Sequence, residues 1–180
     1  MIIYSSNNPQ DIKVVCGEWD IDSQIESKPK QERTVASISV HPQFNKRQFY
    51  HDVALLHLEE DFVLDLHLDV ACLPHSPIDG SDNFIPSGCV VTGWGDRAEL
   101  EASDRKDSAQ PIMKAVRNLP IVGHDECQQG FRDQVDQRFR LHDSFICAGG
   151  ERGVDACTGD GGGPLVCPGR FTKRTDVEPR

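Results

Sequence analysis

The sequence predicts an all-β fold, and three of its features indicate that class. Its apolar residues fall in short runs rich in valine and isoleucine, the composition that is typical of strands. Clusters of glycine and proline, which interrupt regular structure, separate these runs. Only one segment carries the start signals of a helix. At 180 residues the chain suggests one domain, because β-barrels and sandwiches of about 200–250 residues commonly fold as one unit.

The first half of the chain carries three predicted strands. Residues 11–19 hold β-branched side chains ahead of a glycine, which predicts a strand. Residues 35–40 alternate apolar with small or polar side chains, as a half-buried strand does, and a His-Pro pair ends them. Between these two strands, the polar residues 20–33 predict a loop. The third strand, residues 52–58, is an acid followed by a short run that we expect to be buried.

The second half is expected to contain further strands and one helix. The segment 96–110 is polar and strongly charged, which predicts an exposed loop. A short helix is predicted within residues 125–137, with an acidic first turn and Asp125 as its cap. The predicted strands are residues 89–95, 113–121 and 144–150.

Charge and cysteine content limit the classes of function. The formal net charge of −10 argues against a nucleic-acid partner and against an anionic membrane surface. No apolar run approaches the ~20 residues that a bilayer-spanning helix needs. The first residues lack the pattern of a signal peptide, yet the dispersed cysteines predict disulfides in an oxidising compartment, so we expect the start of the protein to be missing. The seven cysteines are Cys16, Cys72, Cys89, Cys127, Cys147, Cys157 and Cys167.

The most informative stretch is residues 157–167, which read C-T-G-D-G-G-G-P-L-V-C. Glycine at this density indicates a backbone that takes positive φ or passes close to another group. A glycine turn that leads into a strand can present N–H groups to a pocket, as an oxyanion hole does. The alternative is an ordinary surface turn held by cysteines, and the spacing alone does not decide between them.

This stretch resembles the nucleophile loop of the trypsin/chymotrypsin-like serine peptidases, whose pattern is G-D-S-G-G-P-L. Residues 159–165 match it at six of seven positions, and the exception is the nucleophile, which is Gly161 here. The D-V-A-L-L run that begins at Asp52 resembles the family segment that carries the triad aspartate. Residues 72–74, 92–95 and 145–149 resemble further landmarks of the family.

The resemblance implies a chymotrypsin-like double six-stranded β-barrel that is incomplete. The early strands of the first barrel are absent, as are the last strand of the second barrel and the C-terminal helix. Residues 1–168 would form this partial peptidase domain. Residues 169–180 are a polar tail that we expect to be disordered.

Shorter matches such as G-E-W-D, H-P-Q-F and L-V-C-P resemble the arthropod clip-domain serine protease homologues of the prophenoloxidase-activating factor type. That likeness implies a secreted, non-catalytic binding or cofactor module in an innate-immune cascade. Its protein partner would be prophenoloxidase or an activating protease. Two alternatives stay open: a trypsin-like endopeptidase whose catalytic parts are incomplete in this chain, and a fragment without function.

The resemblance also assigns roles to individual residues. Asp52 would be the retained triad aspartate, and Gly159 and Asp160 would belong to the oxyanion loop. Asp155 stands six residues before Gly161, where trypsin-like members place the acid of the specificity pocket, although an exposed loop aspartate is the alternative. In the family, the residue at Asp160 accepts the amino terminus made by activation cleavage, so here we expect another partner or solvent.

The family's catalytic histidine lies in an A-A-H-C segment, and none of the seven histidines of this chain stands in one. His51 adjoins Asp52, but neighbours on a strand point to opposite faces, so we interpret His51 as a loop-end histidine. Without serine or histidine at the catalytic positions, the sequence predicts no peptidase activity.

Disulfides and a metal loop complete what the resemblance implies. Cys89 would pair with Cys167, and Cys127 with Cys147, while the other three cysteines stay unassigned. In some members a loop like the one between Glu18 and Glu32 holds calcium, although a plain charged loop is the preferred interpretation. We expect no other cofactor.

Overall fold

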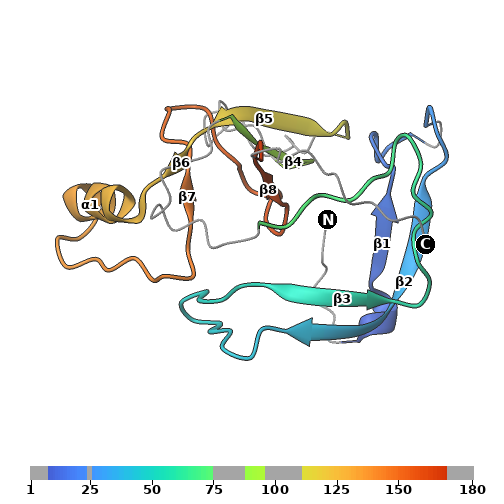
Figure 1. Ribbon diagram of the computed structural model, residues 1–180, viewed down its shortest axis with the longest axis horizontal. Coiled ribbons are helices and arrows are strands. Elements are labelled where there is room, and N and C mark those ends of the chain that lie inside the picture. Colours follow the sequence, from blue (N-terminus) through green and yellow to red (C-terminus); the bar gives the residue numbers. More distant parts are fainter. Residues whose placement is uncertain (1–7, 24–25, 75–87, 96–110, 170–180) are drawn as a thin grey trace, which may run out of the picture.

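The computed structural model describes residues 8–23, 26–74, 88–95 and 111–169. Strands dominate, in three small antiparallel sheets with one α-helix, as Figure 1 shows. This is the expected all-β class, and its short sheets fit an incomplete chymotrypsin-like double barrel. The predicted loop 96–110 and nearly all of the predicted tail lie outside the described residues.

The first half forms a three-stranded sheet in the order β1-β2-β3. A short 3-10 helix, η1, precedes it, and β2 begins at Gln31, so the prediction of a loop as far as residue 33 was wrong. The charged start of β2 is stabilised by long-range pairs that no local pattern reveals: Lys13 binds Glu32, and the Arg33 guanidinium lies over the Phe62 ring. The elements are η1 (Pro9–Asp11), β1 (Lys13–Cys16), β2 (Gln31–Val40) and β3 (Ala54–Leu58).

Strand β3 is less buried than its sequence predicts. The side chain of Leu55 is 64% exposed, and exposure alternates along the strand. The reason is position: β3 pairs with β2 on one side only and is the outer strand of its sheet. The buried apolar residues of this half are instead Ile12, Val35 and Leu68.

The second half contains one three-stranded sheet, in the order β5-β4-β8, and one pair of short strands, β6 and β7. Pro120 divides the single strand predicted for residues 113–121 into β5 and β6, since proline has no N–H to donate to the ladder. The elements are β4 (Cys89–Gly93), β5 (Lys114–Leu119), β6 (Ile121–Val122), β7 (Cys147–Ala148) and β8 (Leu165–Val166).

The helix α1 (His124–Gln134) begins one residue before the predicted segment. Its N-cap is Gly123, and no side chain caps it, so the prediction that Asp125 is the cap was wrong. Asp125 lies inside the first turn, where a carboxylate still interacts favourably with the helix dipole. In the part of the chain that the structure describes, no helix is long and apolar enough to cross a membrane.

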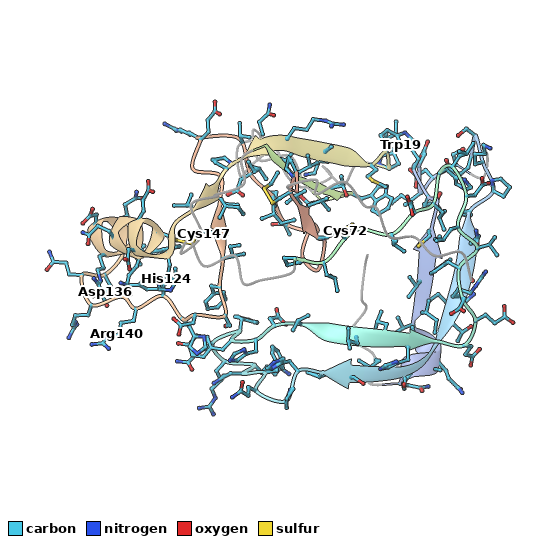
Figure 2. The ribbon with its side chains drawn as sticks, in the orientation of Figure 1. Trp19, Cys72, His124, Asp136, Arg140 and Cys147 are labelled. Carbon is cyan, nitrogen blue, oxygen red and sulfur yellow. A yellow bond between two sulfur atoms is a disulfide. The ribbon has the colours of Figure 1, made fainter. Side chains whose placement is uncertain are left out.

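The core of the second half is built around a disulfide. Cys89, Leu119 and Ile121 are buried together. Cys89 forms a disulfide with Cys167, the residue that follows β8 in the chain. A second disulfide joins Cys127 on α1 to Cys147 on β7, beside the helix in Figure 2. These are the two pairings that the resemblance implies. Among the described residues, the unpaired cysteines are Cys16, Cys72 and Cys157.

Among the described residues, hydrogen bonds and ring contacts join the two halves at two places. One, which we call the Trp19 joint, is held by three hydrogen bonds. The Trp19 carbonyl accepts from the Met113 N–H at 2.8 Å and from the Trp94 indole N–H at 3.1 Å, and the Ile21 N–H donates to the Pro111 carbonyl at 2.9 Å. Figure 2 shows Trp19 close to one end of β5. The other meeting place involves the connection between β2 and β3 and the segment ahead of β7.

Candidate functional site

The glycine loop, residues 157–163, folds as two successive turns ahead of β8. The Asp160 N–H donates to the Cys157 carbonyl at 3.0 Å, and the Gly163 N–H donates to the Asp160 carbonyl at 3.1 Å. Gly159 and Gly162 have φ values of 96° and 82°, a region that side chains disfavour. The density of glycine in the sequence therefore reflects real backbone demands.

A buried carboxylate lies at the centre of this loop. Asp160 is 7% exposed, and its two oxygens face three donors. Oδ1 accepts the Gly95 N–H at 2.9 Å, and Oδ2 accepts the Cys157 N–H at 3.0 Å. The Lys114 ammonium lies 3.2 Å from Oδ2. Asp160 thus has an internal cation as partner, and sequence patterns gave no sign of Lys114 because that contact depends on the pairing of β5 with β4.

The surroundings of Asp160 keep it ionised. Burial alone would raise the pKa of this carboxyl, because burial disfavours the charged form. The Cys157 and Gly95 N–H groups and the Lys114 ammonium outweigh burial and hold the pKa below its ordinary value. The charge and its donors therefore form one electrostatic unit at neutral pH.

Three glycines in or near the Asp160 loop leave no room for a side chain. A Cβ added at Gly93 would lie 2.2 Å from Asp160 Oδ1, and one added at Gly95 would lie 2.5 Å from the Thr158 carbonyl oxygen. At Gly159 an added Cβ would lie 2.9 Å from the Gly95 Cα. The glycines of residues 92–95 and of the glycine loop therefore share one packing requirement.

Gly161, at the position of the nucleophile, differs from these glycines. It is exposed, its φ is not positive, and an added Cβ would have no heavy atom within 4 Å. Neither space nor backbone conformation requires glycine at this position. A side chain would fit here, so the missing hydroxyl is not a consequence of the loop's geometry.

The structure does not assemble a triad around Asp52. This carboxylate is exposed just ahead of β3 and, in the described part of the chain, has no hydrogen bond or ion pair. His51 stacks on His41 instead of facing Asp52. One serine–histidine pair occurs elsewhere, with Ser39 Oγ 3.0 Å from His57 Nε2, but both side chains are exposed and no described carboxylate orients the histidine.

Asp155 lies on the surface. It is exposed, and its Oδ1 accepts the N–H of the next residue, Ala156, at 2.8 Å. This placement matches the alternative of an exposed loop aspartate, and it gives no support to a role at the base of a specificity pocket.

The loop that could hold calcium already contains a cation. The Glu18 side chain is 10% exposed and pairs with the Lys30 ammonium at 2.5 Å. Glu26 accepts the Trp19 and Asp20 N–H groups at 3.1 Å each, and Glu32 pairs with Lys13. No cluster of three acidic, histidine or cysteine side chains suited to a metal occurs among the described residues. The second oxygen of the Glu18 carboxylate, Oε1, is buried with no hydrogen-bond partner among the described residues.

Comparison with known proteins agrees with the sequence patterns. The family model described as Trypsin matches residues 3–173. Phenoloxidase-activating factor 2 of Galleria mellonella is 36% identical over 93% of this chain and 53% of its own length. Inactive CLIP domain-containing serine protease A8 of Anopheles gambiae is 35% identical over 90% of the chain and 42% of its own length. Inactive CLIP domain-containing serine protease A3 of Aedes aegypti is 37% identical over 87% of the chain and 31% of its own length. The chain thus spans about half or less of these relatives.

The contrast between required and optional glycines can be tested with two matched variants. We expect Gly93→Ala to lower the free energy of unfolding by about 1–3 kcal/mol, because the new methyl group would overlap Asp160 Oδ1. Gly161→Ala should change it by less than about 0.5 kcal/mol, as an exposed site with open space allows. Urea denaturation of both variants measures the difference, and equal losses would contradict the packing argument.

The ion pair predicts how stability depends on pH. Because the pKa of Asp160 is lower in the folded chain, its ionisation stabilises the fold above the ordinary pKa of about 3.9, and that contribution is lost as the pH falls through the lowered value. Lys114→Met should cost about 1–3 kcal/mol at pH 7 and should reduce the stability lost in acid, because the ammonium no longer helps to hold the pKa of Asp160 down.

Denaturation of the wild type and of Lys114→Met between pH 7 and pH 2.5 checks this expectation. Asp160→Asn is the control, since it removes the titrating group, and its stability should vary less over the acid range. Superimposable profiles for the wild type and Lys114→Met would show that the ammonium contributes nothing to the carboxylate.

Proposed function

Because this chain belongs to the trypsin family, we propose that it is a non-catalytic serine protease homologue that acts as a secreted binding or cofactor module in a phenoloxidase-type cascade of innate immunity. The module uses no metal or organic cofactor. Its partner is a protein, either prophenoloxidase or a protease that activates it.

The observation that carries this proposal is the state of residue 161. The loop keeps the buried Asp160 and the glycines that its packing requires, yet it lacks the hydroxyl that would attack a carbonyl. In a serine protease of unrelated fold that uses the same triad, loss of the nucleophile alone lowers kcat by about 10⁶. A loop that is preserved in shape but lacks its reacting atom is what a binding module would retain.

Relatives support both parts of the proposal. Two of those compared are named inactive CLIP domain-containing serine proteases, and a third is named a phenoloxidase-activating factor. The chemistry of this chain agrees with the first name, since Asp52 has no described partner and Gly161 has no side chain. The second name supports the choice of partners.

Absence of peptidase activity is the first test. We expect the purified chain to cleave no peptide substrate with Lys or Arg at the scissile position, and to form no adduct with a phosphonate probe directed at reactive serines. Gly161→Ser should remain folded, because its side chain has open space, and should stay inactive, because no histidine of this chain contacts that position among the described residues.

Active trypsin under the same conditions is the positive control. Mass spectrometry would locate any adduct. A covalent phosphonate adduct on the wild-type chain, or turnover that a serine-directed inhibitor abolishes, would overturn the non-catalytic assignment.

Partner binding is the second test. We expect the chain to co-elute in size-exclusion chromatography with purified prophenoloxidase or with its activating protease, and to raise the phenoloxidase activity formed when the two are mixed. A catalytically active trypsin domain of similar size, blocked by an inhibitor, is the matched control. If the chain binds neither protein and leaves phenoloxidase formation unchanged, the cofactor role is wrong, whereas the absence of catalysis could still hold.

A further inference from the structure

The second meeting place of the two halves is a cluster of three histidines, which we call the histidine joint. His41 follows β2 and His51 precedes β3. Their rings stack, with centroids 4.7 Å apart and an angle of 8° between the ring planes. His142, from the segment ahead of β7, meets the His51 ring edge-on at 5.2 Å. Tyr50 stacks on His142 at 3.9 Å. Rings from both halves thus form one contiguous group.

The hydrogen bonds of the joint require neutral imidazoles. His142 Nδ1 accepts the Ser144 N–H at 3.2 Å, and the Ser144 hydroxyl lies 2.9 Å from the same nitrogen. That hydroxyl oxygen in turn accepts the backbone N–H of His51 at 3.0 Å, a bond between the two halves. His41 Nδ1 accepts the Gln43 N–H at 3.1 Å. A nitrogen that accepts a hydrogen bond carries no proton, so Nδ1 is unprotonated in both rings.

We propose that the histidine joint is an acid-sensitive latch, which holds the two halves together at neutral pH and releases them in mild acid. Protonation changes each Nδ1 from an acceptor into a donor that faces another N–H group. It also places positive charges on rings whose centroids are about 5 Å apart. Both effects weaken the same contacts, and histidine is the side chain that titrates in this range of pH.

The electrostatic surroundings agree with this geometry. Burial, followed by the neighbouring His41 and His142, lowers the pKa of His51. A histidine whose pKa is lower in the folded state stabilises the fold above its ordinary pKa of about 6.5 and loses that contribution as the pH falls. The joint is therefore closed near pH 7.5 and weakens below about pH 6.5.

No described carboxylate stabilises an imidazolium in the joint. Asp52 and Asp143 adjoin the cluster in sequence, but both are exposed and neither pairs with its three rings, and Asp143 lies 3.8 Å from His124 instead. Tyr50 is the other titratable group that packs against the rings. Asp136, next to the second segment, pairs with Arg138. The other charged residues near the joint are basic and exposed: Lys46, Arg47, Arg138 and Arg140.

The Trp19 joint responds differently to acid. Its three hydrogen bonds use backbone groups and an indole N–H, none of which titrates in mild acid. Acid should therefore open the molecule at one end while the other end stays joined. The prediction concerns the fold alone and does not depend on whether the chain binds a partner.

Hydrogen–deuterium exchange of the wild-type chain at pH 7.5 and pH 5.5 tests the latch, after correction for the intrinsic pH dependence of exchange. We expect exchange in residues 41–53 and 139–146 to become several-fold faster at pH 5.5, because protonated imidazoles no longer accept the Gln43 and Ser144 N–H groups. Exchange at Ile21 and Met113, in the Trp19 joint, should change little. Equal corrected rates at the two pH values in residues 41–53 and 139–146 would overturn the proposal.

Variants identify the groups that titrate. His51→Asn removes one ring of the cluster and its positive charge in acid, and asparagine tolerates the φ of 53° at this position, so the pH dependence of exchange should be reduced. His57→Gln, at an exposed histidine on β3 outside the joint, is the matched control and should keep the wild-type response. A variant His51→Asn that retains the full response, or a control that loses it equally, would contradict the assignment.

A measurement on the wild type alone covers the case in which His51→Asn does not fold. The ring protons of the histidines can be followed by NMR as a function of pH. We expect the His51 ring to show a pKa below the ordinary histidine value, because burial and the neighbouring rings disfavour its charged form. A His51 curve at the ordinary value would overturn the latch.

Discussion

The carboxylate of Asp160 joins parts of the second half that are distant in sequence. It binds the turn that follows β4 through Gly95, its own loop through Cys157, and β5 through Lys114. A buried charge is costly unless its donors are all present, so these three segments must keep their positions together. The same closeness excludes a Cβ at Gly93. One carboxylate therefore determines which residues the surrounding loops can contain.

Two internal lysines supply cations that the family takes from elsewhere. In the resemblance, the carboxylate at Asp160 meets an amino terminus made by cleavage, and the loop around Glu18 meets calcium in some members. Here the Lys114 and Lys30 ammonium groups lie 3.2 Å and 2.5 Å from those carboxylates. Each of these two carboxylates thus has a lysine of the same chain beside it.

Local sequence patterns predicted what depends on local chemistry. The all-β class, most of the strands and the glycine loop follow from periodicity and backbone preference. Features that depend on register or on tertiary position were missed: the Lys114 contact, the start of β2 at Gln31 and the exposure of Leu55. The prediction that Asp125 caps the helix was wrong because an acid inside the first turn gives the same local sequence signal as an acid at the cap. The histidine joint brings together residues 91 positions apart, from His51 to His142, which no short pattern encodes.

The histidine joint and the substitution at Gly161 are connected by a geometric argument. In the family, the triad aspartate corresponds to Asp52 in the first half and the nucleophile to residue 161 in the second, so catalysis requires the two halves to be held at a fixed separation. Under the non-catalytic role proposed above, no chemistry depends on that separation, since Asp52 has no described partner and Gly161 has no side chain. The contacts between the halves are then free to respond to conditions. Neutral imidazoles at one joint and backbone hydrogen bonds at the other give the molecule one end that acid can open and one that it cannot.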